Sequence, residues 1–169
     1  MIIDISDYLA EKTDSLHYEN TFKIDTMDIG GRSITFTKPI FITVDINKVD
    51  GSGYLYGDIA YEYIENCARC LKEFNQKVVG VLNGRIIERT SKNEEEIEED
   101  VIYYEGEDLD LTKYVMNTIM LSLPMKSLCK EDCKGLCPKC GKNLNDGKCD
   151  CVIEDIDPRL EMLKDFFID

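Results

Sequence analysis

The sequence has one histidine, no tryptophan and no apolar stretch long enough to cross a bilayer. A membrane-spanning helix needs about 18 or more consecutive apolar residues, so the sequence excludes one. The first residues also lack the basic start and the unbroken apolar middle of a secretion signal, because Asp4 and Asp7 interrupt them. We therefore expect a soluble protein that stays in the cytoplasm.

Candidate catalytic groups are equally scarce. His17 is the only histidine, and it lies in a predicted strand with no nucleophile beside it in sequence. Catalysis by serine or cysteine requires a base placed next to the nucleophile. No glycine-rich phosphate-binding loop occurs either. The sequence predicts a protein that is not an enzyme, with His17 as a surface or half-buried strand residue.

Positive charge is in deficit. The chain carries 20 Lys and Arg against 34 Asp and Glu, which gives a formal charge of −14. A field of this sign repels phosphate backbones, so any contact with RNA has to be local. Residues 94–110 hold ten acids and no base, without the ligand spacing of a calcium loop. This run predicts an extended linker or mobile loop.

Lysines gather in one place, around the cysteines between residues 126 and 150. This stretch holds six lysines and four acids, which makes a weak basic patch in an acidic chain. Its candidate contacts for RNA or a protein partner are Lys134, Lys139, Lys142 and Lys148.

Residues 15–87 predict several antiparallel strands, because they are rich in Thr, Ile, Val, Tyr and Phe and are interrupted by turn residues. Asp50-Gly51-Ser52-Gly53 is typical of a hairpin turn. Asn83-Gly84 fits either a second hairpin or one long strand with a bulge.

Tyrosines recur at alternate positions in this region, at Tyr54, Tyr56, Tyr61 and Tyr63. Exposed tyrosines can stack on the bases of single-stranded RNA. Alternation along a strand is ordinary sheet packing, however, and no basic groove accompanies these residues. We expect them to pack in the core.

Two helices are predicted in the last third of the chain. Thr112 can cap the first, whose apolar residues recur every three or four positions until Pro124 ends it. The second starts at Asp157-Pro158, a favourable helix start.

The expected fold is α+β: mainly antiparallel β-sheet or a partial barrel, with a few helices and a C-terminal cysteine-rich zinc segment. We assign residues 1–108 to a β-rich core that ends in the acidic loop. Residues 109–169 hold a helix, the zinc-binding segment and a C-terminal helix packed on the core.

Six of the eight cysteines lie within residues 129–151. Grouped thiols in a reducing cytosol are more often metal ligands than disulfides. Zn²⁺ prefers four tetrahedral thiolates, so a first structural site is predicted from Cys137, Cys140, Cys149 and Cys151. Gly141 would relieve the tight backbone that follows Cys140. By spacing alone, Cys133 could replace Cys149 or Cys151.

The remaining Cys-x-x-Cys, Cys67 and Cys70, ends a predicted strand and has two interpretations. It can join Cys129 and Cys133 in a second tetrathiolate zinc site, which accounts for all eight cysteines. Alternatively, Cys67 is a redox thiol, which needs cationic neighbours or a helix N-terminus, and Arg69 supplies only part of that environment.

Several segments together resemble the YceD family of large ribosomal RNA subunit accumulation proteins. They are CARCL at 67–71, LDLT at 109–112, LPM at 123–125, CKGLCPKCGKNLN at 133–145 and IDPRLEMLK at 156–164. The resemblance extends from about Ile2 to Phe166.

Membership of that family implies a bacterial cytoplasmic, non-enzymatic factor needed for large-subunit rRNA to accumulate. An acidic protein is better suited to hold a basic ribosomal protein than to wrap rRNA, with the lysine-rich zinc segment as a supporting contact to rRNA precursors. Two alternatives remain open: a cytosolic thiol redox protein or sensor using Cys67 and Cys70, and a structural zinc-ribbon adaptor of another complex.

Overall fold

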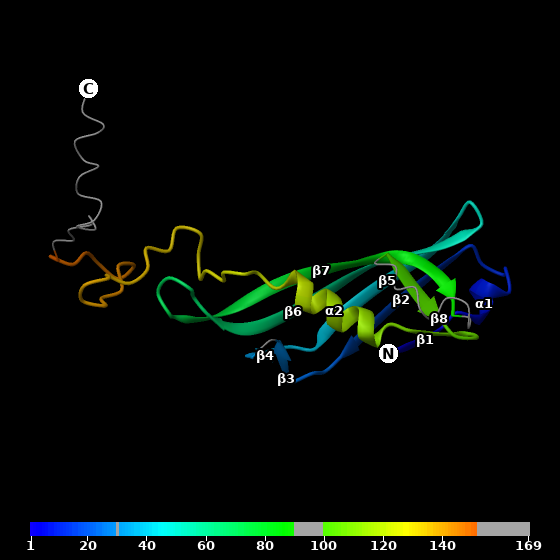
Figure 1. The fold of residues 1–169 in the computed structure, drawn as a ribbon, viewed down its shortest axis with the longest axis horizontal. Coiled ribbons are helices and arrows are strands. Elements are labelled where there is room, and N and C mark those ends of the chain that lie inside the picture. The colour runs from blue at the N-terminus through cyan, green and yellow to red at the C-terminus, as the bar shows by residue number, and fades with distance from the viewer. Residues whose placement is uncertain (30, 90–99, 152–169) are drawn as a thin grey trace, which may run out of the picture.

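The computed structural model describes residues 1–29, 31–89 and 100–151. The described chain forms a long open β-sheet with a helix on one face and a cysteine-rich segment at one end (Figure 1). The expected α+β class with a mainly antiparallel sheet is confirmed, and the sheet is open rather than a partial barrel. Among the described helices, none has the length and apolar character needed to span a membrane.

The main sheet is built around two long strands, β6 (Ser52–Asn66) and β7 (Glu73–Glu88), which pair antiparallel along their whole length. On the other edge, β6 pairs first with β5 (Ile40–Val49) and then with β4 (Arg32–Phe36). The outer strands are β2 (Ser15–Phe22) beside β5 and β3 (Thr26–Ile29) beside β4.

The predicted hairpin at residues 50–53 is confirmed. Val49 pairs with Ser52, so Asp50 and Gly51 form a two-residue turn with φ of 49° and 77°. A type I′ turn requires positive φ at both central residues, and its backbone twist matches the right-handed twist of the two strands that it joins. At Asn83-Gly84 the structure selects one continuous strand, because the register of β7 against β6 runs through both residues without a bulge.

The acidic segment is more regular than expected. Residues 94–99 lie outside the described chain, but β8 (Val101–Tyr104) and β9 (Asp108–Asp110) are strands. β8 pairs parallel to β7, and β9 pairs antiparallel with β1 (Ile2–Asp4). The prediction of a linker is therefore wrong for these residues, because the apolar side chains between the acids are buried: Val101, Ile102 and Leu109.

Two helices are described, the short α1 (Ser6–Leu9) and α2 (Thr112–Ser122). The helix expected before Pro124 is confirmed, but its predicted cap is wrong. Thr112 is the first helical residue, and its N–H and hydroxyl both donate to Oδ1 of Asp110, at 2.9 and 2.6 Å. The expected helix at Asp157-Pro158 lies outside the described residues.

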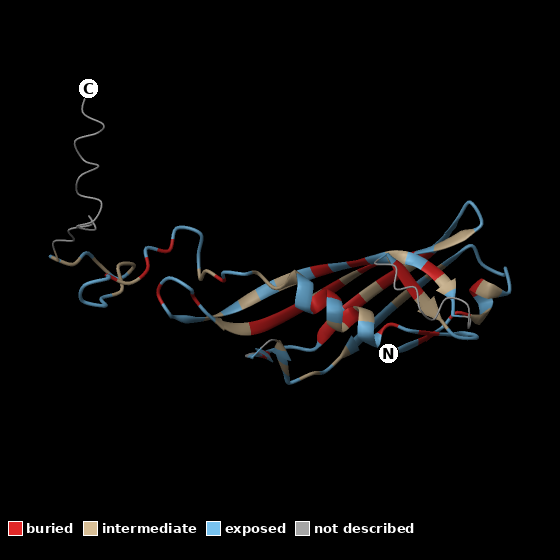
Figure 2. Cartoon of the chain, in the orientation of Figure 1, coloured by how far each residue is buried: buried red, intermediate tan, exposed pale blue. Residues whose placement is uncertain are grey.

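The core lies between α2 and one face of the sheet, where buried residues concentrate (Figure 2). Val115 and Ile119 face the sheet, and the hydroxyl of Tyr61 donates to the carbonyl of Ile119 at 3.2 Å. Tyr61 and Tyr63 are buried as predicted. The same prediction is wrong for Tyr54 and Tyr56, which are about half exposed because they point to the opposite face.

A close approach at Gly80 allows α2 to dock. A Cβ at this position would lie 2.9 Å from both Cγ2 of Thr118 and Oγ of Ser122. We expect Gly80→Val to lower the free energy of unfolding by about 1–3 kcal/mol, because the added carbons push α2 from β7. Urea denaturation measures the change. The control Val81→Ala, on the exposed face, should stay within about 0.5 kcal/mol, and equal losses in both variants would contradict this account.

Candidate metal centre

The described cysteines form two clusters, each with four sulfur atoms within 4.8 Å of one another. The proximal cluster contains Cys67, Cys70, Cys129 and Cys133. The distal cluster contains Cys137, Cys140, Cys149 and Cys151. These are the groupings proposed from the sequence, and Cys133 lies with the proximal group, which removes the alternative in which it joins the distal one. Each cluster can hold a metal ion.

The proximal cluster is assembled from two parts of the chain. Cys67 and Cys70 lie in the turn between β6 and β7, and Cys129 and Cys133 follow α2. The N–H of Ala68 donates to the carbonyl of Ser127 at 2.8 Å, which places the second segment along the turn. Three of the thiols are buried, with only Cys129 partly exposed.

Both Cys-x-x-Cys turns have the same backbone. In the proximal turn the N–H of Leu71 donates to the carbonyl of Cys67, and the N–H of Cys67 donates to that of Lys72, both at 2.9 Å. In the distal turn the N–H of Gly141 donates to the carbonyl of Cys137, and the N–H of Cys137 donates to that of Lys142, both at 2.8 Å. The residue after the second cysteine has positive φ in each turn, 58° at Leu71 and 72° at Gly141, as the sequence predicts for the glycine.

The sulfur spacing fits a tetrahedral ion. Sγ of Cys67 lies 3.7 Å from that of Cys133, and Sγ of Cys70 lies 3.7 Å from that of Cys129. Four sulfurs at about 2.3 Å from a central Zn²⁺ would be about 3.8 Å apart, whereas a disulfide is about 2.0 Å long. The donor set and its spacing therefore match a metal centre better than a disulfide pair.

The surroundings of the thiols favour partial ionisation of each cluster. Burial opposes ionisation of Cys67, but N–H groups of Cys129, Cys70 and Arg69 outweigh it and lower its pKa to about 6. N–H groups of Cys140 and Lys139 lower the pKa of Cys137 to about 6.

The opposite shift occurs at one thiol of each cluster. Burial and the neighbouring thiols raise the pKa of Cys129 to about 12. The hydrogen bond with the thiol of Cys140 and, after it, burial raise the pKa of Cys151 to about 12. Four thiolates this close repel one another, and a divalent cation at the centre removes that repulsion.

The guanidinium of Arg69 is engaged with the backbone of the second cysteine segment. Its guanidinium donates to the carbonyl of Cys133 at 2.9 Å, and its own carbonyl accepts the N–H of Leu136 at 3.1 Å. It ties the two cysteine segments together through the backbone. The sequence carries no signal for this role, because the contact joins residues that are 64 positions apart.

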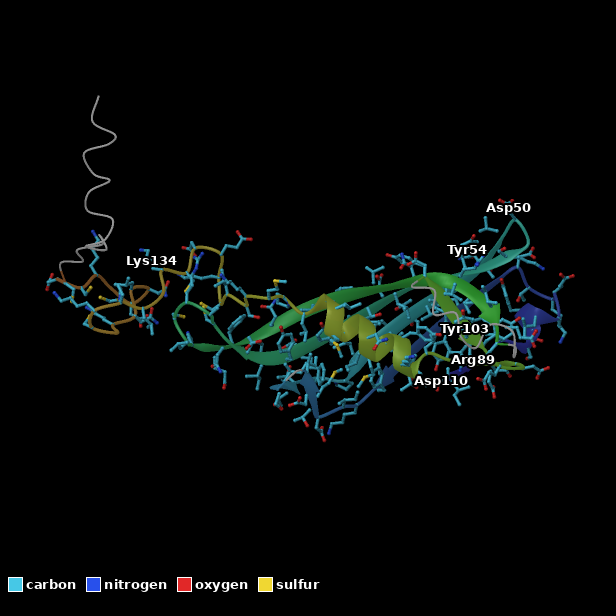
Figure 3. All side chains as sticks on the ribbon, viewed as in Figure 1. Asp50, Tyr54, Arg89, Tyr103, Asp110 and Lys134 are labelled. Carbon is cyan, nitrogen blue, oxygen red and sulfur yellow. The ribbon has the colours of Figure 1, made fainter. Side chains whose placement is uncertain are left out.

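The four candidate contact lysines, Lys134, Lys139, Lys142 and Lys148, are all exposed on the segment that carries the distal cluster. Nζ of Lys142 donates to the carbonyl of Lys148 at 2.8 Å. Figure 3 shows Lys134 at the opposite end of the molecule from Asp50, beyond the β6–β7 turn. The lysines thus lie away from the acidic sheet, and their contact with RNA or protein stays a prediction.

Other candidate sites carry no comparable arrangement. His17 is an exposed strand residue as predicted; Nδ1 lies 2.6 Å from Oδ1 of Asp45 and Nε2 lies 3.3 Å from Oε1 of Glu19. These bonds raise its pKa, and none of its described contacts is a nucleophile.

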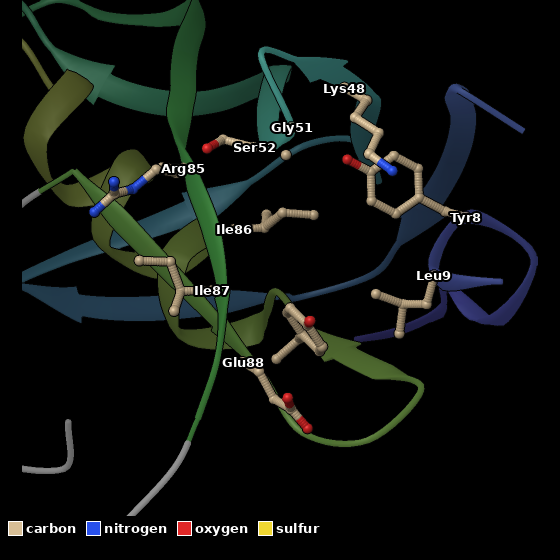
Figure 4. A pocket seen from close by; sticks show the side chains of 11 residues that line it. Tyr8, Leu9, Lys48, Gly51, Ser52, Arg85, Ile86, Ile87 and Glu88 are labelled. Carbon is tan, nitrogen blue, oxygen red and sulfur yellow. The ribbon is translucent and has the colours of Figure 1, made fainter. Parts of the chain in front are cut away.

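A hollow beside α1 has a volume of about 400 Å³ and is lined by Tyr8, Lys48, Arg85 and Glu88, among others (Figure 4). Lys48 is already paired with Glu11, at 2.7 Å. No group of three or more metal-ligating side chains occurs there in the described chain. The two cysteine clusters are therefore the candidate functional centre.

Fold and site together define a class: a mainly antiparallel sheet protein with two tetracysteine clusters, the first of which is built on the turn of its longest hairpin. The family described as large ribosomal RNA subunit accumulation protein YceD matches residues 55–167. The chain belongs to the YceD family. The matched range begins in β6 and contains α2 and both clusters, whereas the resemblance seen in the sequence was expected to begin near Ile2.

Relatives among curated proteins share parts of the chain. An uncharacterized protein of Mycobacterium tuberculosis is 34% identical over 97 residues, covering 57% of this chain and 47% of its own. The chloroplastic large ribosomal RNA subunit accumulation protein YCED homolog 1 is 38% identical over 61 residues in Arabidopsis thaliana, covering 35% and 19%. The Zea mays protein of the same name is 24% identical over 144 residues, covering 67% and 48%.

The chain thus spans less than half the length of these curated relatives. No solved structure gives a significant match.

Leu71 offers a test of the turn geometry. Its φ of 58° is one that glycine adopts freely and other residues adopt at a cost of about 1–2 kcal/mol. We expect Leu71→Gly to raise the free energy of unfolding by up to about 1 kcal/mol, after the entropy cost of glycine. Urea denaturation of the metal-loaded protein measures it. Leu71→Ala keeps the Cβ and its strain, so an equal gain in that control would assign the effect to the exposed side chain instead.

Proposed function

We propose that this protein supports the accumulation of large-subunit rRNA as a non-enzymatic assembly factor that contacts a ribosomal protein and rRNA precursors in the cytoplasm. Membership of the YceD family carries this proposal. Two relatives from plants bear the name large ribosomal RNA subunit accumulation protein. In the described chain, no nucleophile contacts the single histidine, which is compatible with a binding role.

The charge distribution supports two kinds of contact. The chain carries a formal charge of −14, which attracts basic proteins and repels bulk RNA. The cysteine-rich segment differs, because four exposed lysines lie on the stretch of chain that carries the distal cluster. A basic ribosomal protein is the main partner on this account, and the lysine-rich segment makes the local contact with phosphate.

The metal in both clusters is Zn²⁺ on this proposal, and its role is structural. Four thiolates leave no open coordination position for substrate, and tetrahedral all-sulfur sites select zinc or iron–sulfur chemistry. Few apolar side chains pack against the proximal cluster, chiefly Phe74, Leu128 and Leu136. Metal binding would therefore supply the folding energy that this small segment cannot gain from a core.

The binding role is tested by affinity purification from native extract, with and without RNase. We expect large-subunit rRNA precursors and ribosomal proteins to be recovered, with the protein partners resistant to RNase. Replacing Lys134, Lys139, Lys142 and Lys148 by Gln should lower RNA recovery about tenfold, because four phosphate contacts are lost.

The matched control replaces Lys12, Lys23, Lys77 and Lys113 by Gln, which changes the net charge by the same amount at positions outside the cysteine-rich segment. An equal loss of RNA in both variants would argue against a local contact. Recovery of neither rRNA nor ribosomal proteins would overturn the assembly role.

Metal content separates the structural role from a redox role, which the lowered pKa of Cys67 favours. We expect elemental analysis to find about two zinc ions per chain. The variants Cys67→Ser/Cys70→Ser and Cys149→Ser/Cys151→Ser should each retain one, and thiol counting should find no disulfide. A Cys67–Cys70 disulfide in the resting protein with one zinc would instead support the redox protein.

A further inference from the structure

One side chain of the distal loop contacts the proximal cluster. Asn145 lies between Cys140 and Cys149, within the loop that joins the two halves of the distal cluster. Its Nδ2 is 3.4 Å from Sγ of Cys133, which belongs to the proximal cluster. A loop bounded by the thiols of one cluster thus supplies a hydrogen-bond donor to a sulfur of the other.

The orientation of this amide is fixed by its other partners. The N–H of Lys134 donates to Oδ1 of Asn145 at 3.0 Å, so the NH₂ end faces Cys133. Oδ1 of Asn143 accepts the backbone N–H of Asn145 at 3.0 Å and its Nδ2 at 2.8 Å. These hydrogen bonds fix the Nδ2 donor of Asn145 independently of its contact with the sulfur.

The loop itself depends on the distal turn. The N–H of Leu144 donates to the carbonyl of Gly135 at 2.9 Å, and Leu136 and Asn143 form an isolated antiparallel bridge. The carbonyl of Lys142 accepts the N–H of Cys137 at 2.8 Å. An ion that closes the distal cluster would fix Cys140 and Cys149, and with them both ends of the loop that carries Asn145.

From this geometry we propose that Asn145 couples the two clusters, so that a metal ion in the distal cluster raises the affinity of the proximal cluster for its own ion. A donor to a ligating sulfur stabilises the thiolate that binds metal, and loss of such a partner costs about 10–100-fold in affinity. The coupling is reciprocal, since each ion must favour binding of the other by the same factor. It rests on the zinc binding proposed above.

Two isosteric variants separate the N–H···S bond from the general integrity of the loop. Asn145→Asp keeps an acceptor for Lys134 but has no donor for Cys133. Asn143→Asp adds the same charge to the same loop and keeps the oxygen that Asn145 uses. Zinc affinity of the proximal cluster is measured by competition with a chromophoric chelator. Asn145→Asp should lower it about 10–100-fold, and Asn143→Asp should leave it unchanged.

The coupling is tested by removing the distal ion with Cys149→Ser/Cys151→Ser. This change should lower proximal affinity in the natural chain and produce no further loss when combined with Asn145→Asp. Alkylation of Cys129 and Cys133 by iodoacetamide, followed by mass spectrometry, reports the same effect at single sites, as faster labelling.

Equal proximal zinc affinities in Asn145→Asp and Asn143→Asp would overturn the coupling. So would an equal loss of proximal affinity on Cys149→Ser/Cys151→Ser in the natural chain and in Asn145→Asp. Two zinc ions that bind independently would refute only the coupling. A chain that binds no zinc at either cluster would refute the metal proposal as well.

Discussion

The cysteine-rich segment at residues 126–151 depends on the convergence of four thiols from segments separated by about 60 residues in sequence. The β6–β7 hairpin places two of them, and the chain that leaves α2 brings the other two. Hydrogen bonds through Ala68 and Arg69 set the path of that chain as far as Leu136. Since the distal cluster starts at the next residue, its position follows from that of the proximal one.

Two different sources of stability therefore operate in one chain. The sheet and α2 bury a continuous set of isoleucines, leucines and aromatic rings, among them Ile42, Ile59 and Tyr63. The cysteine-rich segment has only a few apolar neighbours and satisfies its buried sulfurs with backbone N–H groups. Most of the acidic residues belong to the first part, whereas the second carries the four exposed lysines at 134, 139, 142 and 148.

Local patterns predicted the features that depend on local chemistry. Asp50-Gly51 fixed the β5–β6 hairpin because both residues adopt positive φ, and Pro124 marked the end of α2. Features set by distant contacts were missed. The strands β8 and β9 were missed because acidic residues dominate their segment and indicate a linker. Their apolar residues are buried only through pairing with β7 and β1. The exposure of Tyr54 and Tyr56 follows from the face on which α2 packs, which alternation along β6 cannot reveal.

The pairing of β1 with β9 has a consequence for how the chain is made. Ile3 pairs with Leu109, and Ile3 and Ile5 are almost completely buried. During synthesis from the N-terminus, β2 to β7 can associate while these two isoleucines still await a partner more than 100 residues downstream. Cys67 and Cys70 can complete their cluster only after Cys129 and Cys133 have been synthesised. Vectorial synthesis thus imposes an order of closure: sheet, N-terminal strand, proximal cluster and distal cluster.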